Sequence, residues 1–156
     1  MTDVDGVLND GKRFFTNDGE TTKIFHVRDG MAVNILLRNN IPTVILTKEK
    51  SSIVIKWAKD MNVSMVMSGI QKKEITLSHI CKKFNVEENE IAYIGDDVND
   101  AAVLQRVGFS ACPRDASDHV KKIVDYKCKT CGGHGTLREI CDIILLSKYG
   151  DKTIWY

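Results

Sequence analysis

This sequence contains few prolines, no long apolar run and almost no excess of either charge. Only two of its 156 residues are proline, so no proline-rich linker divides it, and the length suits one domain spanning residues 1–156. No apolar stretch approaches the roughly 20 residues that a membrane-spanning helix needs. The formal net charge of +1 gives no electrostatic reason to expect nucleic acid or an anionic membrane as a partner.

Cysteines are also too few and too scattered to form a disulfide framework. There are five, an odd number, which fits a reducing compartment. Cys128 and Cys131 form one CxxC pair, but a structural zinc site usually takes four ligands, so we interpret them as ordinary thiols. Because no basic and then apolar leader precedes the first motif, we expect a cytoplasmic protein.

What the sequence does contain is an alternation of short apolar runs and helical patterns, which predicts a Rossmann-like α/β fold: a parallel sheet flanked by helices. The expected strands are rich in Val, Ile or Met and cover residues 41–46, 64–67, 91–94 and 109–112. The expected helices cover residues 30–39, 51–62, 72–84, 100–107, 116–124 and 136–147.

The first part of the chain departs from this alternation. Residues 11–27 predict a β-hairpin with a turn at Asn17-Asp18-Gly19, placed so that it could cover a site beside it. A first strand that ends at Asp3 would be abnormally short, since a central strand usually has about five residues. Either the domain tolerates this short strand or the chain was cut from a longer one, and the sequence does not decide between these interpretations.

Two carboxylates follow that first strand, in the motif Asp3-Val4-Asp5-Gly6. At a strand tip, one acid can act as a nucleophile that forms an acyl-phosphate, while the other protonates the leaving oxygen and later activates water. The alternative is a polar turn with two solvated carboxylates.

Three more carboxylates follow the strand at residues 91–94, at Asp96, Asp97 and Asp100. Clustered acids repel one another unless a cation neutralises them, and oxygen ligands in an open site suit Mg²⁺. The alternative is an acidic helix N-terminus, where aspartate is favourable without any metal. That alternative is serious for Asp100, whereas for Asp96 we favour the metal role.

Thr47 and Lys73 complete the set of candidates, each near a strand end. A threonine hydroxyl there could bind a phosphate oxygen, although such a residue more often caps a helix. A lysine could offset charge on a phosphate and a nucleophile, although most lysines are solvated. The order of the four candidates, which is the Asp3-Asp5 motif, Thr47, Lys73 and the motif from Asp96 to Asp100, is far more specific than any one of them. Ligands bind at the carboxyl ends of such strands, near which all four lie.

With these motifs the sequence resembles the haloacid dehalogenase-like phosphatase superfamily over essentially its whole length. The resemblance implies that Asp3 is the nucleophile and Asp5 the acid and base. It also implies that the Asp3 carboxylate, the Asp5 main-chain carbonyl and Asp96 hold Mg²⁺. The other implied roles are phosphoryl binding by Thr47 and Lys73, and support of the metal and the lysine by Asp97 and Asp100.

Within that superfamily the chain resembles the capless subgroup. Residues 48–68 suit one helix and one strand, which leaves no room for a cap domain. Members of the subgroup dephosphorylate 3-deoxy-octulosonate 8-phosphate or nonulosonate 9-phosphates, and the carboxy-terminal domains of acylneuraminate cytidylyltransferases are similar to them.

The segment Gly132-Gly133-His134-Gly135-Thr136-Leu137-Arg138-Glu139 resembles a glycine-rich signature of the subgroup. In relatives this tail (here about residues 132–150) comes from or packs beside a neighbouring subunit of a tetramer. The resemblance therefore implies a homotetramer in which Gly133 and Gly135 lie near the substrate, a small sugar-acid phosphate. The alternative for an isolated glycine-rich turn is a flexible helix entry.

Thr47 is followed by Lys48-Glu49-Lys50, where nonulosonate-phosphate relatives have Gly-Glu-Lys, so Lys48 departs from their pattern. Through Glu49 and Lys50 the resemblance favours a nine-carbon substrate (KDN 9-phosphate or N-acylneuraminate 9-phosphate), with Glu49 accepting hydrogen bonds from sugar hydroxyls. Two alternatives remain: a 3-deoxy-D-manno-octulosonate 8-phosphate phosphatase, and a non-catalytic oligomerisation domain of an acylneuraminate cytidylyltransferase. The complete set of acids favours an enzyme over the non-catalytic domain.

Overall fold

Short parallel strands form the centre of the fold in the computed structural model, which describes residues 1–151 apart from the side chains of residues 20 and 21. Strand β3 (Val44–Leu46) pairs with β4 (Met65–Met67), and β5 (Ala92–Ile94) pairs with β6 (Phe109–Cys112), which pairs with β7 (Tyr126–Lys127). Thr2 forms parallel bridges to both Ile45 and Ile94. The first residues of the chain therefore join the two strand groups.

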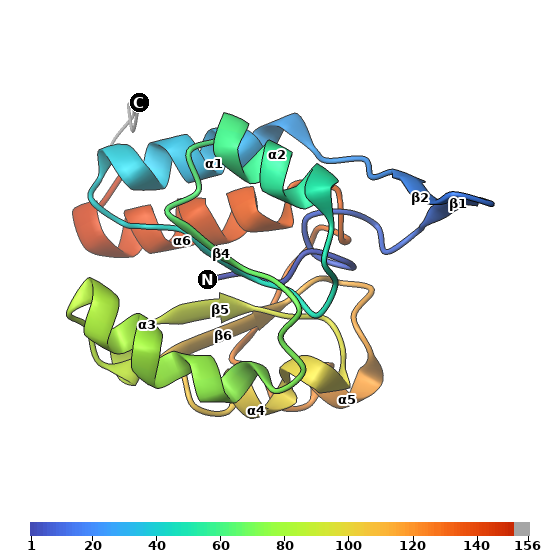
Figure 1. The fold of residues 1–156 in the computed structure, drawn as a ribbon. Helices are drawn as coiled ribbons and strands as arrows, with labels where there is room; N and C mark the ends of the chain where they lie inside the picture. The colour runs from blue at the N-terminus through green and yellow to red at the C-terminus, as the bar shows by residue number, and fades with distance from the viewer. Residues whose placement is uncertain (152–156) are drawn as a thin grey trace.

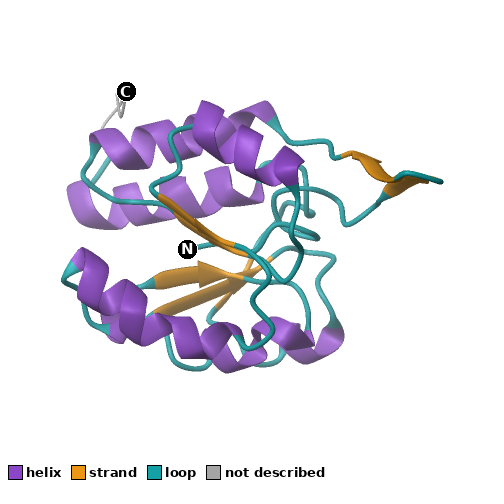
Figure 2. Ribbon diagram, in the orientation of Figure 1, coloured by secondary structure: helices purple, strands orange, loops and turns teal. Residues whose placement is uncertain are grey.

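Helices cover both faces of these strands (Figures 1 and 2). Helices α1 (Val27–Arg38), α2 (Ser52–Asp60) and α6 (Thr136–Tyr149) lie on one side, and α3 (Leu77–Phe84), α4 (Ala101–Leu104) and α5 (Asp118–Lys121) lie on the other. Each face has its own buried core, because Ile45 belongs to one apolar cluster while Val44 and Leu46 belong to the other. This is the parallel α/β arrangement that the sequence predicts.

Most elements are shorter than predicted, but β6 has the predicted bounds, and α1 and α6 are longer than predicted. The strand expected from residue 41 begins at Val44, since Pro42 has no N–H to donate to a ladder. Two predicted helices begin with 3₁₀ turns instead, η1 (Lys73–Thr76) before α3 and η3 (Val98–Asp100) before α4, and a third turn, η2 (Glu88–Glu90), precedes β5. Strand β7 was not predicted, because its two residues, Tyr126 and Lys127, form no apolar run.

A two-stranded antiparallel hairpin projects from the domain (Figure 1). It consists of β1 (Phe14–Thr16) and β2 (Gly19–Thr22), and its turn uses the positive φ of 112° at Gly19. The predicted hairpin is therefore confirmed, but its second strand ends at Thr22 and does not extend over residues 23–27. Lys23, the next residue, returns to the body of the domain and is buried.

The carboxyl and amino ends of the strands differ in character. At the amino ends, a cavity of about 560 Å³ has apolar walls that include Met1, Ile91 and Ile140. The acidic residues do not line it, since they follow the strands at the opposite ends. Among residues 1–151, no helix is both long and apolar enough to cross a membrane.

Candidate active site

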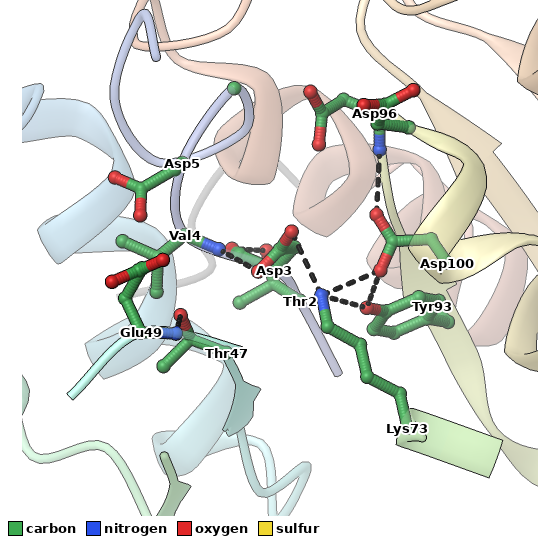
Figure 3. A network of polar contacts seen from close by, with 12 residues as sticks. Thr2, Asp3, Val4, Asp5, Thr47, Glu49, Lys73, Tyr93, Asp96 and Asp100 are labelled. Atoms are coloured by element: carbon green, nitrogen blue, oxygen red, sulfur yellow. Dashed lines mark hydrogen bonds and ion pairs between the residues drawn. The ribbon is translucent and has the colours of Figure 1, made fainter. Parts of the chain in front are cut away.

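Three of the predicted carboxylates meet at the carboxyl ends of the central strands (Figure 3). Asp3 follows the bridging residue Thr2, and Asp96 follows β5 after one glycine. One oxygen each of Asp3, Asp96 and Asp100 lies within 4.8 Å of the other two. The parallel topology thus brings together acids that are more than 90 residues apart in the sequence.

Lys73 lies in the middle of this acidic group. Its ammonium contacts Asp3 Oδ2 at 2.8 Å and Asp100 Oδ1 at 2.7 Å, and its side chain is almost fully buried. Burial alone would lower the pKa of Lys73, but the attraction of Asp3 and Asp100 outweighs it and raises the pKa. The lysine is therefore a fixed positive charge beside the predicted nucleophile.

Tyr93 is a member of this network that sequence reasoning missed. Its hydroxyl donates to Asp100 Oδ1 at 2.5 Å and accepts from Lys73 Nζ at 3.3 Å. The residue is fully buried in β5, where the sequence shows it only as one more large strand residue. The tyrosine holds Asp100 and Lys73 together from behind the site.

Asp100 and Asp97 have different surroundings. Asp100 is buried, and its second oxygen accepts the Asp96 N–H at 3.1 Å, so both of its oxygens are engaged by the protein. Asp97 is exposed and accepts the Val98 N–H at 2.8 Å at the start of η3. Asp100 is therefore placed to support the lysine, while Asp97 contributes negative charge from the rim.

The pKa values of Asp3 and Asp96 reflect a crowded acidic site. Burial and the charge of Asp100 raise the pKa of Asp3 to about 7, against the opposing effect of Lys73. Burial and the charges of Asp3, Asp100 and Asp97 raise the pKa of Asp96 to about 8. Among the described residues, the Asp96 carboxylate has no hydrogen-bond donor, so its charge needs a cation from outside the chain.

The donors at this position fit a small divalent cation. The oxygens of Asp3 and Asp96 would form part of an open oxygen-ligand set of the kind that Mg²⁺ prefers, while the predicted contribution of the Asp5 main-chain carbonyl remains a prediction. Gly6 lets the loop after Asp5 approach closely, because a Cβ at Gly6 would lie 2.0 Å from Asp96 Oδ2. The glycine thus brings the Asp5 backbone against Asp96.

The Asp5 side chain points away from the Lys73 network and is held by two other residues. Lys23 Nζ lies 2.5 Å from Asp5 Oδ1, and Asn9 Nδ2 donates to the same oxygen at 2.8 Å. Neither Lys23 nor Asn9 was predicted as a site residue. A lysine just after a hairpin gives no sequence signal, because its direction depends on where the second strand ends.

Thr47 and Glu49 lie on the opposite side of the site from Lys73 (Figure 3). Thr47 is buried, and its hydroxyl accepts the Glu49 N–H at 3.2 Å. The Glu49 carboxylate lies 3.2 Å from the Arg13 guanidinium, at the base of the hairpin. Glu49 therefore stands at the rim of the site with an arginine beside it.

The glycine-rich segment packs against the loop that carries Asp5. Gly133 N–H donates to the Val7 carbonyl at 2.9 Å, and a Cβ at Gly133 would lie 2.6 Å from the Asp10 nitrogen. A Cβ at Gly132 would lie 2.0 Å from the Gly6 carbonyl oxygen. These glycines permit close contact between two backbone segments of the same chain, while the predicted substrate contacts of Gly133 and Gly135 remain predictions.

Known proteins are similar to this chain over most of its length. Residues 5–140 match the family of haloacid dehalogenase-like hydrolases. The 3-deoxy-D-manno-octulosonate 8-phosphate phosphatase of Escherichia coli (strain K12) is 35% identical over 148 residues, which cover 95% of this chain and 79% of that protein. The enzyme of the same name from Haemophilus influenzae is 37% identical over 145 residues, covering 93% of this chain and 81% of that protein.

Solved structures agree with these matches. The cobalt-bound deoxy-D-mannose-octulosonate 8-phosphate phosphatase of Haemophilus influenzae superposes with a TM-score of 0.91 at 36% identity, covering 94% of this chain and 86% of that one. The 3-deoxy-D-manno-octulosonate 8-phosphate phosphatase of Moraxella catarrhalis, in complex with magnesium ion, phosphate ion and KDO, gives 0.88 at 33% identity over 92% and 83% of the chains. The chain therefore belongs to the haloacid dehalogenase-like hydrolase family, as a phosphatase with the Rossmann-like parallel fold of that family.

Proposed function

We propose that the chain is a Mg²⁺-dependent phosphatase that hydrolyses 3-deoxy-D-manno-octulosonate 8-phosphate. The observation that carries the proposal is the buried Lys73 ammonium held between Asp3 and Asp100, with the Asp96 carboxylate beside it. The relatives named for this substrate support the eight-carbon acid over the nine-carbon acid that Glu49 and Lys50 favour in the sequence.

The chemistry follows from the partners of each acid. Asp3 attacks phosphorus and forms an aspartyl-phosphate, while Lys73 holds the attacking carboxylate and offsets the charge of the phosphoryl group. Asp5 gives its proton to the departing sugar oxygen and then accepts one from the water that attacks the aspartyl-phosphate. Inorganic phosphate leaves, and Asp3 is restored.

The metal site would be formed by Asp3, the Asp5 carbonyl and Asp96. Bound there, Mg²⁺ supplies positive charge that neutralises the acids and stabilises the phosphoryl oxygens. Thr47 is placed beside the site by its bond to the Glu49 N–H, which supports its predicted contact with the phosphoryl group.

A nonulosonate 9-phosphate is the second candidate substrate, and one observation favours it. The Glu49 carboxylate stands at the rim, where it could accept hydrogen bonds from hydroxyls of a longer sugar acid. However, Glu49 is paired with Arg13 at 3.2 Å, so a substrate hydroxyl would have to compete with a guanidinium.

Phosphate release on a panel of esters separates these candidates. The panel contains 3-deoxy-D-manno-octulosonate 8-phosphate, KDN 9-phosphate, N-acylneuraminate 9-phosphate and 4-nitrophenyl phosphate, each with and without Mg²⁺. We expect the highest kcat/KM on the eight-carbon ester with Mg²⁺. A preference for a nine-carbon ester would overturn the proposed substrate, and no release from any ester by folded protein would favour a non-catalytic domain.

The covalent step has its own test. Asp3→Asn removes the attacking oxygen, so it should abolish turnover of every ester in the panel while the protein remains folded. Asp60→Asn is a matched control, because Asp60 is an exposed acid of α2 that pairs with Lys56 at 3.0 Å and belongs to no part of the site. Undiminished turnover by the Asp3→Asn variant would exclude Asp3 as the nucleophile.

The predicted homotetramer and cytoplasmic location belong to the same proposal. The projecting hairpin carries Phe14 and Phe15, which are 52% and 63% exposed, and an apolar projection of this kind supports assembly with other copies of the chain. All five cysteines are free, which supports a reducing compartment. Sedimentation analysis at micromolar concentration tests the tetramer, and a monomer with full activity would exclude any need for a neighbouring subunit.

A further inference from the structure

We propose that Lys23 is a positioning residue for catalysis, which fixes the Asp5 carboxylate through one oxygen so that the other oxygen exchanges the proton with the leaving group. The inference rests on the proposed function, in which Asp5 is the acid. It goes further by assigning a role to a lysine from the hairpin connection and by distinguishing the two oxygens of Asp5.

The contact between Lys23 and Asp5 has the features of a built interaction. Lys23 Nζ lies 2.5 Å from Asp5 Oδ1, and the lysine side chain is fully buried while that of Asp5 is 24% exposed. Lysine is rarely buried without a partner, because removing its charge from water is costly. Asp5 supplies the opposite charge, and the ion pair connects the hairpin base to the loop of the predicted nucleophile.

A second donor converges on the same oxygen. Asn9 Nδ2 donates to Asp5 Oδ1 at 2.8 Å, and Asn9 is 1% exposed. The asparagine is itself oriented, because its carbonyl oxygen accepts the N–H groups of Gly11 at 2.8 Å and Gly6 at 3.3 Å. Two oriented donors on one oxygen restrict rotation of the carboxyl group.

The other oxygen of Asp5 is left for chemistry. In the part of the chain that the structure describes, Asp5 Oδ2 accepts no hydrogen bond, whereas both oxygens of Asp100 are engaged. Asp5 also lies apart from the Lys73 network and toward the side of Glu49 (Figure 3). This geometry points to Oδ2 as the oxygen that carries the transferable proton, on the rim side where a leaving sugar would lie.

The step that depends on this position is the departure of the alcohol. An Asp3 oxygen forms a bond to phosphorus, the bond from phosphorus to the ester oxygen breaks, and its electron pair stays on that oxygen. The proton of Asp5 Oδ2 moves to the same oxygen, so a neutral alcohol departs and Asp5 becomes a carboxylate. Without correct placement of Oδ2, a poor leaving group must depart as an alkoxide.

The test compares leaving groups, because only a poor one needs the proton. The variants are Lys23→Met, which keeps a long apolar stem, and Lys23→Gln, which keeps a neutral donor. We measure kcat/KM, which reports the steps up to alcohol departure, on 3-deoxy-D-manno-octulosonate 8-phosphate and on 4-nitrophenyl phosphate. Since general acid catalysis contributes about 10²–10⁴-fold, we expect Lys23→Met to lose about 100-fold on the sugar ester and less than about fivefold on the aryl ester. The glutamine variant should lie between wild type and Lys23→Met.

Asp5→Asn and the double variant Lys23→Met/Asp5→Asn complete the cycle. If Lys23 acts through Asp5, the double variant should be no slower on the sugar ester than Asp5→Asn alone. Equal losses on both esters in Asp5→Asn would overturn the acid role of Asp5, and with it the proposed mechanism. A selective loss in Asp5→Asn but equal losses on both esters in the Lys23 variants would overturn the positioning role alone.

Lys12, two residues before the hairpin begins at Phe14, provides the matched control. It pairs with Asp10 at 2.8 Å, but its side chain is 78% exposed, and its ion pair in the described part of the chain is with Asp10 and not with Asp5. Lys12→Met should leave both kcat/KM values unchanged. If Lys23→Met does not fold, as judged by circular dichroism and thermal melting, the glutamine variant carries the same comparison, and an unchanged leaving-group dependence in it refutes the proposal.

Discussion

Replacing Asp29 by asparagine should change how the stability of the domain depends on pH. Asp29 lies in the first turn of α1 and is fully buried. Its Oδ1 accepts the Arg138 N–H at 3.0 Å, in the first turn of α6, while its Oδ2 has no hydrogen-bond partner among the described residues. Burial raises the pKa of Asp29 to about 6, against backbone N–H groups that favour the charge.

The size of the effect follows from the two pKa values. The ordinary value is 3.8 and the folded value is about 6, so the folded protein holds this proton more tightly than the unfolded chain does. Below pH 3.8 Asp29 is protonated in both states and does not change the free energy of unfolding. The stability that its tightly held proton contributes is lost as the pH rises through 6. At neutral pH the ionised Asp29 costs about 3 kcal/mol, of which about 2 kcal/mol accrues between pH 4.5 and 7.

Urea unfolding of the wild type and of Asp29→Asn at several pH values between 4.5 and 7.5 measures this cost. The experiment needs a chelator, so that no metal contributes to stability. The variant and the wild type can differ in free energy of unfolding at any single pH, so the test is how this difference changes with pH. As the pH rises from 4.5 to 7.5, it should change by about 2 kcal/mol in favour of the variant. Asp3 and Asp96 titrate in both proteins and cancel in the difference. Parallel curves would show that Asp29 ionises without penalty and would refute the reasoning.

Three further predictions concern the site. Mg²⁺ should raise the melting temperature of the wild type more at pH 8.5 than at pH 6. The pKa values of Asp3 and Asp96 are raised to about 7 and about 8, so at pH 6 the metal must displace protons from both groups. Asp96→Asn should abolish the increase in melting temperature. Lys73→Met should abolish phosphate release and lower the free energy of unfolding by about 3–5 kcal/mol, since it leaves buried carboxylates without their cation; unchanged stability in urea would contradict this. Gly133→Ala should lower the melting temperature more than Gly150→Ala does. Both glycines have a φ of 72°, but of the two only Gly133 has backbone atoms within 3 Å of an added Cβ. Equal losses would mean that this close approach does not affect stability.

The candidate site could be predicted from the sequence only where it depends on strand order. Thr47 and Asp96 each follow a short apolar run, Asp3 follows the bridging residue Thr2, and parallel pairing brings such positions to one edge. The 3.6-residue pattern also located α1 and α6, although their ends differ by a few residues. These features are local in sequence or follow from a general topological rule.

The remaining contacts depend on side-chain direction and on close backbone approach, which have no local signal. Lys23 reaches Asp5 because the hairpin ends at Thr22, one residue earlier than the lysine itself. Gly133 is required by the backbone of the Asp5 loop, more than 120 residues earlier, so its sequence neighbours give no reason for it. Tyr93 looks like a core residue because it is one, and only its hydroxyl contacts place it in the site.

The acids of the site are divided between two lysines. Asp3 and Asp100 share Lys73, and Asp5 has Lys23, so two buried ammonium groups serve three carboxylates. Asp96 is the fourth carboxylate, and no described donor contacts its oxygens. In its ionised form Asp96 therefore adds a negative charge that a divalent cation would offset, and Asp5 is a structurally separate acid. Because the two lysines come from different elements, the nucleophile and the proton donor can keep distinct environments although only one residue separates them in the chain.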